Sequence, residues 1–282
     1  MKLIGVDIGG SHITAAQVNR ENLELIAGTY QRDKIDADEN AFVIIKAWAK
    51  VIKRCADGEK DLQIGIAMPG PFDYENGISL MKNQGKYDNL YQLDVKAMLA
   101  EELQLATKQI KFNNDAACFL QGEIFNVGKI AVNSVGVTLG TGLGSAFIRN
   151  GKSYDADLWN TPFKESIMEE YISSRWFVAE FYARTGKPIK DVKQLVEEHA
   201  GEAITRDLFK DFADNLSQFL SYFIKLKDAE CVVLGGNIAK ANAFFLADVK
   251  QALLKDLGKE IPLYLSALGE EAALIGGASL FR

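Results

Sequence analysis

Short apolar runs along this chain repeatedly end in glycine-rich turns, and the first of them opens the sequence. The run over 3–6 reads as a strand and the run over 13–18 as a second strand, separated by a turn that contains Gly9 and Gly10. Because glycine carries no side chain, the backbone of such a turn can approach a ligand closely. The alternative is an ordinary hairpin with a surface aspartate, Asp7, at its bend. Strands that end in glycine turns are predicted over 3–10, 62–70, 134–144 and 230–236.

Between these strands, apolar residues recur at spacings of three and four, which predicts amphipathic helices. In the segment 205–227 the apolar stripe runs from Leu208 to Phe223 and indicates a helix face that packs in the core. Strands that alternate with helices indicate an α/β fold. Helices are predicted over 40–56, 115–127, 164–184, 205–227, 240–257 and 270–281.

The composition is that of an ordinary globular protein, and the length is sufficient for two lobes. Of the 282 residues, 48% are hydrophobic and 25% are charged, and the formal net charge is −6. An acidic chain offers no electrostatic footprint for nucleic acid, so we expect no nucleic-acid partner. The charge leaves a phosphorylated ligand open, because backbone N–H groups and a single cation can hold a phosphate.

We expect no membrane association and a cytoplasmic location. No apolar run approaches the ~18 to 20 residues that span a bilayer, and the N-terminal apolar run is too short for a signal peptide. The cysteines lie far apart, which fits a reducing compartment and offers neither a disulfide framework nor a CxxC metal site. We expect each of them to be a buried thiol without a chemical role: Cys55, Cys118 and Cys231.

Taken together, the glycine turns resemble those of the actin, Hsp70 and sugar-kinase ATPase superfamily, and most closely those of the ROK family of bacterial sugar kinases and repressors. The resemblance covers nearly the whole chain and lies in the stretches DIGGSH, LGTGLGSA, LGGNIAKA and GEEAALIGGASLF. It implies a two-lobed, actin-like α/β fold of the ribonuclease H-like type, with nucleotide and sugar in a cleft between the lobes. The expected lobes are 1–114, rejoined by a C-terminal helix over 270–282, and 115–269.

The resemblance further implies ATP and Mg²⁺ as cofactors. It implies that Asp7 holds Mg²⁺ through water, since this ion gives up its hydration reluctantly. DIGGSH resembles the first phosphate turn of the family, LGTGLGSA the second, and LGGNIAKA the turn on the adenosine side. The implied phosphate contacts are Gly9, Gly10, Ser11, Gly140, Thr141, Gly142 and Gly144, and the implied adenosine-side residues are Gly235, Gly236 and Asn237.

Phosphoryl transfer to an alcohol requires a base beside the acceptor hydroxyl. In the stretch FNNDAACF, Asp115 stands where the family's catalytic aspartate stands, at the start of a helix that follows a strand. The resemblance implies that Asp115 contacts the sugar and takes the proton of its hydroxyl. Asn114 or Asp115 is also a good cap for this helix, and the two roles are compatible.

Sugar binding requires polar side chains that bracket several hydroxyls. The stretch ISLMKNQGKYDNLY resembles the family's sugar loop, which places Asn83 on the sugar, and Asn114 matches a second sugar contact. Asn83 also precedes Gly85 in a pattern typical of a turn. Glu170 matches a third sugar contact of the family, while Glu169 lies one residue away and a solvated helix carboxylate is the alternative.

The chain departs from the family pattern after the second phosphate turn. The family's Glu-x-Gly-His motif and its zinc-binding cluster, CxCGxxGCxE, are both missing, so no zinc site is expected. His12 belongs to the first phosphate turn, and His199 is expected at the surface. The loop that replaces the missing motifs offers side chains that either contact the sugar or are ordinary surface residues: Asp155, Asp157, Trp159 and Asn160.

These features favour an ATP-dependent, glucokinase-like sugar kinase that acts on a hexose, an amino sugar or a glycoside. A transcriptional repressor of the same family is disfavoured, because the first strand begins at Lys2 and leaves no room for a DNA-binding domain ahead of it. A non-catalytic sugar sensor is the other alternative, which the missing motifs suggest and the retained Asp7 and Asp115 oppose. Homodimers are common in the family, and the sequence neither supports nor opposes one here.

Overall fold

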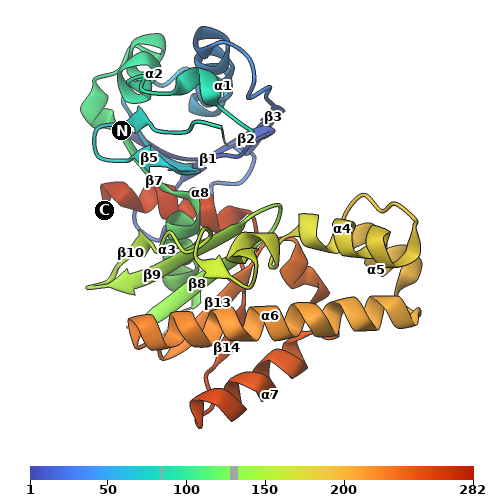
Figure 1. Cartoon of the computed structure of the whole chain (residues 1–282). Helices are drawn as coiled ribbons and strands as arrows, with labels where there is room; N and C mark the ends of the chain where they lie inside the picture. The colour runs from blue at the N-terminus through green and yellow to red at the C-terminus, as the bar shows by residue number, and fades with distance from the viewer. Residues whose placement is uncertain (84, 128–132) are drawn as a thin grey trace. The chain divides into compact units, whose positions relative to one another are not determined.

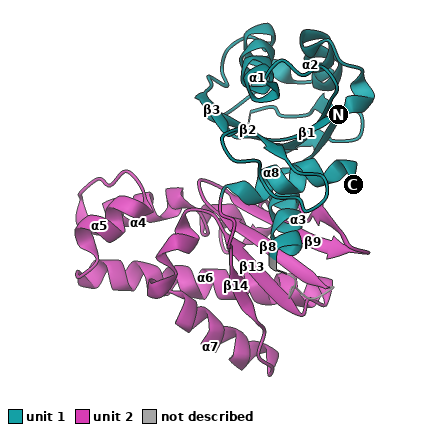
Figure 2. Ribbon diagram, turned by 180° about the vertical axis from the view of Figure 1, so that it is seen from behind, with its two compact units in different colours: residues 1–126, 270–282 teal, residues 127–269 magenta. Residues whose placement is uncertain are grey.

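The chain folds into two compact units, each built around one five-stranded sheet. The structure, a computed structural model, describes residues 1–83, 85–127 and 133–282 (Figure 1). The first unit combines Met1–Asn126 with Glu270–Arg282, and the second comprises Val127–Gly269 (Figure 2). The first unit therefore contains both ends of the sequence, and its last helix is contributed from far along the chain.

The sheet of the first unit joins two antiparallel strands to a parallel set. Strand β1 pairs antiparallel with β2 and parallel with β4, and β4 pairs parallel with β7. The predicted opening hairpin is confirmed, with Ile8 opposite Ile13. The central strands are apolar along most of their length because both faces of the sheet are covered. The strands follow the order β3 (Gln31–Lys34), β2 (His12–Val18), β1 (Lys2–Ile8), β4 (Leu62–Met68) and β7 (Ile110–Asn114).

The sheet of the second unit repeats this topology. Strand β8 pairs antiparallel with β9 and parallel with β13, and β13 pairs parallel with β14. The strand predicted over 230–236 is confirmed as β13. The order is β10 (Lys152–Asp155), β9 (Leu143–Arg149), β8 (Ser134–Leu139), β13 (Cys231–Gly235) and β14 (Leu263–Leu265). Both sheets thus present the carboxyl ends of three parallel strands at one edge, where α/β proteins commonly bind ligands.

Helices and short hairpins complete the first unit. Helix α1 begins after Asn40, whose side chain accepts the Val43 N–H, and it buries Trp48 in the core beneath the sheet. The helices are α1 (Ala41–Ala56), α2 (Val95–Leu103), α3 (Asp115–Val127) and α8 (Glu271–Ala278), with the short helices η1 (Asp88–Leu90), η2 (Thr107–Gln109) and η5 (Ser279–Phe281). A small hairpin joins β5 (Phe72–Asp73) to β6 (Ile78–Ser79).

Helix α8 packs directly against the backbone of the sheet. A Cβ on Gly65 would lie 1.9 Å from the Gly277 oxygen, and one on Gly5 would lie 2.1 Å from the Leu274 oxygen. Only glycine allows two backbones to approach this closely. The two glycines therefore allow α8 to pack directly on β1 and β4.

The same helix also holds α3 in the first unit. A Cβ on Gly122 would lie 2.1 Å from the Ala272 oxygen, and one on Gly276 would lie 1.8 Å from the Cys118 oxygen. Because α3 packs on α8 in this way, the compact units divide after Asn126, whereas the sequence placed the boundary after Asn114.

The core of the second unit is built on its longest helix. The apolar stripe of α6 is buried as predicted, and Phe212 packs against Phe177 of α4 and Phe245 at the start of α7. The elements are β11 (Pro162–Phe163), β12 (Ser166–Ile167), η3 (Met168–Glu170), α4 (Ser174–Thr185), α5 (Val192–His199), α6 (Ala203–Lys227), η4 (Ile238–Phe244) and α7 (Leu246–Leu257).

Two predicted helices differ from the structure. The segment 164–184 begins as a hairpin and becomes α-helical only at Ser174, because the Glu169 N–H bonds to the Trp159 oxygen and not within a helix. The segment 240–257 is interrupted at Phe245, where φ is −139°. Helices α2 and α5 were not predicted at all.

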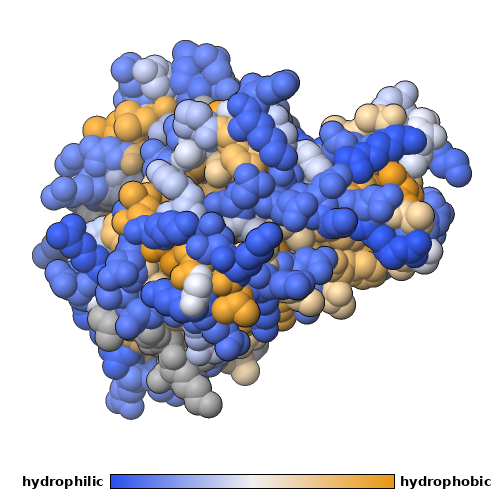
Figure 3. All heavy atoms as spheres, turned by 60° about the horizontal axis from the view of Figure 1, so that its bottom comes forward, coloured by the Kyte–Doolittle hydropathy of each residue, from blue (hydrophilic) through white to orange (hydrophobic). Residues whose placement is uncertain are grey.

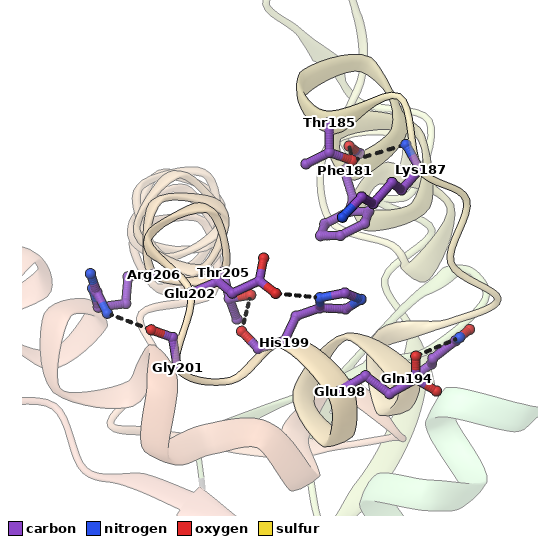
Figure 4. A network of polar contacts seen from close by, with 10 residues as sticks. All are labelled: Phe181, Thr185, Lys187, Gln194, Glu198, His199, Gly201, Glu202, Thr205 and Arg206. Carbon is purple, nitrogen blue, oxygen red and sulfur yellow. Dashed lines mark hydrogen bonds and ion pairs between the residues drawn. The ribbon is translucent and has the colours of Figure 1, made fainter.

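His199 lies where three helices meet. It is half-buried, whereas the sequence predicted a surface position. Its Nδ1 lies 2.8 Å from Glu202 Oε1, and its ring lies 4.9 Å from that of Phe181 on α4. Thr205 of α6 donates its hydroxyl to the His199 oxygen at 2.7 Å (Figure 4). The residue therefore stabilises the junction of α4, α5 and α6.

The helices, the surface hydropathy and the cysteines are those of an ordinary globular protein. None of the described helices is long and apolar enough to cross a membrane. On the face in Figure 3, hydrophilic residues predominate and hydrophobic ones form separate patches. The cysteines are free and buried, as expected: Cys55, Cys118 and Cys231.

The packing of α8 gives a first prediction. Gly65→Ala places a methyl group against backbone that cannot move aside as a side chain can, so we expect the free energy of unfolding to fall by about 1–3 kcal/mol. Urea unfolding measures this change. The matched control is Gly201→Ala, whose added carbon would meet no atom within 4 Å. Equal stability of the two variants would contradict the close approach of α8 to β4.

Candidate functional site

The predicted site residues of the first unit gather at the carboxyl ends of its parallel strands. In the register, Asp7 of β1 lies opposite Ala67 of β4, and the next residue, Met68, lies opposite Asn114 of β7. Asp115 follows at the first position of α3. The topology thus brings together two aspartates that are far apart in the sequence, at the sheet edge expected to hold a ligand.

Asp7 lies in a strongly acidic environment. Its pKa is raised to about 7, first by burial and then by the neighbouring carboxylates of Asp115 and Glu270, while Arg32 opposes the shift. Arg32 is itself engaged by Glu270 at 2.5 Å. The excess of carboxylates over cations makes this end of the sheet suited to a divalent cation.

The first predicted phosphate turn is a tight hairpin loop with bare backbone. The Gly9 N–H donates to the His12 oxygen at 2.9 Å, and His12 begins strand β2 with its Nδ1 2.9 Å from Ser11 Oγ. A Cβ on Gly10 would meet only the Lys86 side chain at 3.5 Å, and neither glycine has a left-handed φ. The chain's own packing does not require these glycines, so their open surface fits access by a ligand.

The predicted sugar loop packs against this turn. Buried Tyr87 donates its hydroxyl to the Gly9 oxygen at 2.6 Å and meets Trp48 edge to face at 5.5 Å between ring centroids. Asn83 is exposed, has a φ of 57°, and donates its N–H to Asp88 at 3.0 Å. The turn interpretation therefore describes the backbone of Asn83, and its side chain remains accessible to a ligand.

Asn114 and Asp115, at the start of α3, make different hydrogen bonds. Asn114 caps the helix, because its Oδ1 accepts the Ala117 N–H at 3.1 Å, and its Nδ2 donates to the Tyr74 hydroxyl at 3.2 Å. Asp115 accepts only the adjacent Ala116 N–H, at 2.8 Å, among the hydrogen bonds of the described residues. Its second carboxylate oxygen is therefore available at the sheet edge.

The second predicted phosphate turn joins β8 to β9 in the second unit. Leu139 pairs with Leu143, and between them the Gly140 N–H donates to the Gly142 oxygen at 3.1 Å. Thr141 is exposed, and a Cβ on Gly140 would meet no atom within 4 Å. Like the first turn, this one presents accessible backbone, here at Gly140, where internal packing does not require glycine.

The predicted adenosine-side turn lies beside it, at the end of the adjacent strand. Gly235 of β13 and Gly144 of β9 both pair with Thr138 of β8, one on each side. Gly236 has a φ of +86°, and a Cβ there would lie 2.3 Å from the last backbone oxygen of β8. Glycine is therefore required at 236 by the fold, and Asn237 follows it exposed at the start of η4.

A carboxylate that the alignment did not select reaches the second turn. Glu169 accepts the Leu143 N–H at 2.9 Å and the Arg175 guanidinium at 2.6 Å, in the space left by Gly142. Its side chain is 18% exposed, against 51% for Glu170, which lies 3.5 Å from Arg175. The only sequence signal for Glu169 is its position next to Glu170, the residue that matches the family's sugar contact.

The loop that replaces the family motifs uses its polar groups internally. Trp159 donates its Nε1–H to Asp157 at 2.9 Å and packs against the core of the second unit, so little of its ring is free for stacking. Asp155 accepts the Asp157 N–H at 2.8 Å, and Asn160 is exposed.

The described residues include no set of three or more His, Cys, Asp or Glu side chains arranged to hold a metal ion. Mg²⁺ usually needs only one or two protein carboxylates, with waters and substrate phosphates as its other ligands. Asp7, with Asp115 nearby, supplies that donor set.

A sequence profile described as the ROK family matches residues 3–156 and 164–282. The unmatched segment, 157–163, lies where the family's histidine and cysteine motifs are missing. The glucokinase of Thermotoga maritima is 25% identical over an aligned length of 318 positions, gaps included. The aligned region covers 100% of this chain and 98% of that protein. The N-acetyl-D-glucosamine kinase of Aliivibrio fischeri is 23% identical over 302 residues, covering 96% of this chain and 92% of that protein.

A solved structure shares the fold over its whole length. The ROK family glucokinase from Streptomyces griseus, in complex with glucose and AMPPNP, aligns with a TM-score of 0.79 at 21% identity and covers 99% of both chains. The α/β fold of this chain is therefore the actin-like, two-lobed fold expected from its glycine turns.

The raised pKa of Asp7 gives a pH-dependent prediction. The folded protein binds a proton at Asp7 more tightly than the unfolded chain does, so this group lowers the free energy of unfolding as pH rises from about 4 to about 7. Asp7→Asn removes the ionisation and keeps the side-chain shape. We expect the variant to gain stability over the original protein at about pH 8, and much less at about pH 5, in urea unfolding with a chelator present.

The matched control is Asp38→Asn, which removes the same charge from an exposed position of the same unit. A gain for Asp7→Asn that is equal at both pH values would contradict the burial of an ionised carboxylate at this site.

Proposed function

Because the chain belongs to the ROK family, we propose that it is an ATP-dependent sugar kinase that phosphorylates a hydroxyl of a hexose, an amino sugar or a glycoside. The named relatives, a glucokinase and an N-acetyl-D-glucosamine kinase, support this class of substrate. At 25% identity or less, these relatives do not identify which sugar is the acceptor, whether glucose, its amino sugar or a related glycoside.

The observation that carries the proposal is the pairing of Asp7 and Asp115 at the end of one sheet that also carries an open glycine turn. A sugar-binding module requires neither a half-buried carboxylate suited to a cation nor a second carboxylate free to take a proton. Phosphoryl transfer needs both, together with backbone donors for the phosphates.

In the proposed reaction, Asp115 accepts the proton of the sugar hydroxyl. The hydroxyl oxygen then forms a bond to the γ-phosphorus, and the bond from that phosphorus to the oxygen bridging to the β-phosphate breaks. The released electron pair leaves with ADP. Mg²⁺, when bound, neutralises phosphate charge and is held by Asp7 through water. The backbone at Gly9, Gly10 and Ser11 approaches the phosphates.

The turns of the second unit are its proposed contacts with the nucleotide. The open backbone at Gly140 and the exposed hydroxyl of Thr141 support the phosphates, with Gly142 and Gly144 shaping the turn. Gly235, Gly236 and Asn237 form the adenosine side at the adjacent strand end.

The proposed sugar contacts come from side chains that still have polar groups to offer. Asn83 is exposed beside the first turn, and Asn114 is held rigidly by its cap and by Tyr74. Glu170 was the expected acidic contact. Glu169 is the better positioned of the two, since Leu143 and Arg175 fix its carboxylate.

The test of the proposed function is sugar-dependent release of ADP from ATP with Mg²⁺, across hexoses, N-acetylhexosamines and β-glucosides. Asp115→Asn removes the base and keeps the side-chain shape, so we expect kcat to fall by about 10²–10⁴-fold while both KM values change little. Asp38→Asn serves as the charge-matched control and is expected to keep full turnover.

Binding of sugar with no sugar-stimulated turnover would instead support the non-catalytic sensor. Turnover that survives Asp115→Asn unchanged would exclude Asp115 as the base and leave the kinase reaction with another proton acceptor.

The neighbouring glutamates provide a second test within the same assay. Glu169→Gln keeps an oxygen for the Leu143 N–H but loses the charge, and we expect the KM for the sugar to rise at least about tenfold, as for loss of a charge-assisted hydrogen bond. Glu170→Gln is the adjacent control and is expected to change that KM less than about twofold, as an exposed charge does. The reverse pattern would restore Glu170 as the sugar contact.

A further inference from the structure

The first unit contains a cavity that the proposed reaction does not use. Its volume is about 500 Å³, and it opens among α2, η2, β7 and η5. Three lysines line it, one from each of three elements: Lys96 of α2, Lys108 of η2 and Lys111 of β7. A cluster of cations is unexpected in a chain with a net charge of −6.

The three ammonium groups form no close ion pair with a carboxylate among the described residues, although Lys96 lies near enough to Asp73 to help lower the pKa of that carboxyl. Over residues 1–83, 85–127 and 133–282, none of the three lysines lies within 4.0 Å of an acidic oxygen in an ion pair. One carboxylate residue, Glu75, lines the same cavity. The cavity therefore carries more positive than negative charge and is suited to an anion.

Two of the lysines are held in place by backbone oxygens. Lys111 donates to the Leu280 oxygen at 2.7 Å and lies 4.6 Å from the centre of the Phe281 ring. Lys96 donates to the Glu75 oxygen. An ammonium has three N–H donors, so each of these lysines keeps two for a ligand while its position is fixed.

The aromatic wall of the cavity is also fixed. The Tyr74 hydroxyl donates to the Met68 oxygen at 3.1 Å and accepts from Asn114 at 3.2 Å. The Tyr74 ring packs on Phe72 at 5.3 Å, and Phe72 packs on Phe112 at 5.1 Å between centroids. A cavity with such a wall is formed before any ligand arrives, as small-molecule sites usually are.

We infer that this cavity is a second ligand site, which binds the phosphate monoester of a small sugar. The lysines supply point charges for a dianionic phosphate. Glu75, Thr107 and Tyr74 also line the cavity, so a carboxylate, a hydroxyl and an aromatic side chain are present there for the sugar's hydroxyls and carbon skeleton. The volume lies within the ~300–1,000 Å³ of ligand pockets. The site is separate from the glycine turns and does not rest on the proposed kinase reaction.

The experiment is a titration of the isotope-labelled full chain with glucose 6-phosphate, followed by the amide chemical shifts of Thr107, Lys108 and Lys111. We expect saturable shifts at these residues. Lys108→Glu changes an exposed position, and we expect it to raise the dissociation constant for glucose 6-phosphate, measured from these shifts, by at least tenfold. Lys46→Glu makes the same charge change at an exposed position on α1 and is expected to leave it within twofold.

Each other outcome overturns the inference. Shifts confined to the glycine turns, and lost in Asp7→Asn, would place the ligand at the candidate kinase site alone. Equal weakening by both charge reversals would indicate non-specific attraction. If inorganic phosphate bound as tightly as glucose 6-phosphate, the site would recognise the phosphate alone and not the sugar. The titration measures ligand binding and not turnover. Its result can therefore be interpreted even if the chain proves to have no kinase activity.

Discussion

The close approach of α8 to β1 and β4 is the contact on which the first unit depends. Gly5 and Gly65 leave the strands without side chains where the helix crosses them. The strand ends that carry Asp7 and Asn114 are therefore supported by a helix encoded at the opposite end of the sequence. Glu270, immediately before that helix, raises the pKa of Asp7, so the packing and the electrostatics of the site share one origin.

The repeated sheet topology explains why the two units carry similar turns. In each, parallel strands end side by side, and the first of them is followed by a tight turn into an antiparallel strand. Glycine serves two purposes at these strand ends. At Gly236 the fold requires it, since both φ and the neighbouring strand exclude a side chain. At Gly10 and Gly140 the fold would accept a side chain, and the proposed approach of the phosphates accounts for its absence.

Local periodicity was sufficient for much of this fold, and long-range contacts account for what it missed. The opening hairpin, the buried strand before Gly235 and the stripe of α6 follow from side-chain spacing alone. Helix α4 starts late because Glu169 bonds to the preceding loop, a contact that no local pattern reveals. The choice between Glu169 and Glu170 likewise depends on which side chain meets the second turn. The lysine-lined cavity combines Lys96 with Leu280, residues that only the folded chain brings together.

The two sites proposed in the first unit would bind an anion by different means. In the proposed phosphate site, backbone N–H groups of the glycine turn would contact the anion whatever the chain's net charge, and a cation at Asp7 would offset the acidic surroundings. In the proposed cavity site, ammonium groups fixed by backbone oxygens would supply the positive charge without a metal. Tyr74 belongs to both regions, since its ring lines the cavity and its hydroxyl bonds to Asn114. The hydrogen bonds that fix this wall of the cavity are therefore also among those that orient Asn114 at the start of α3.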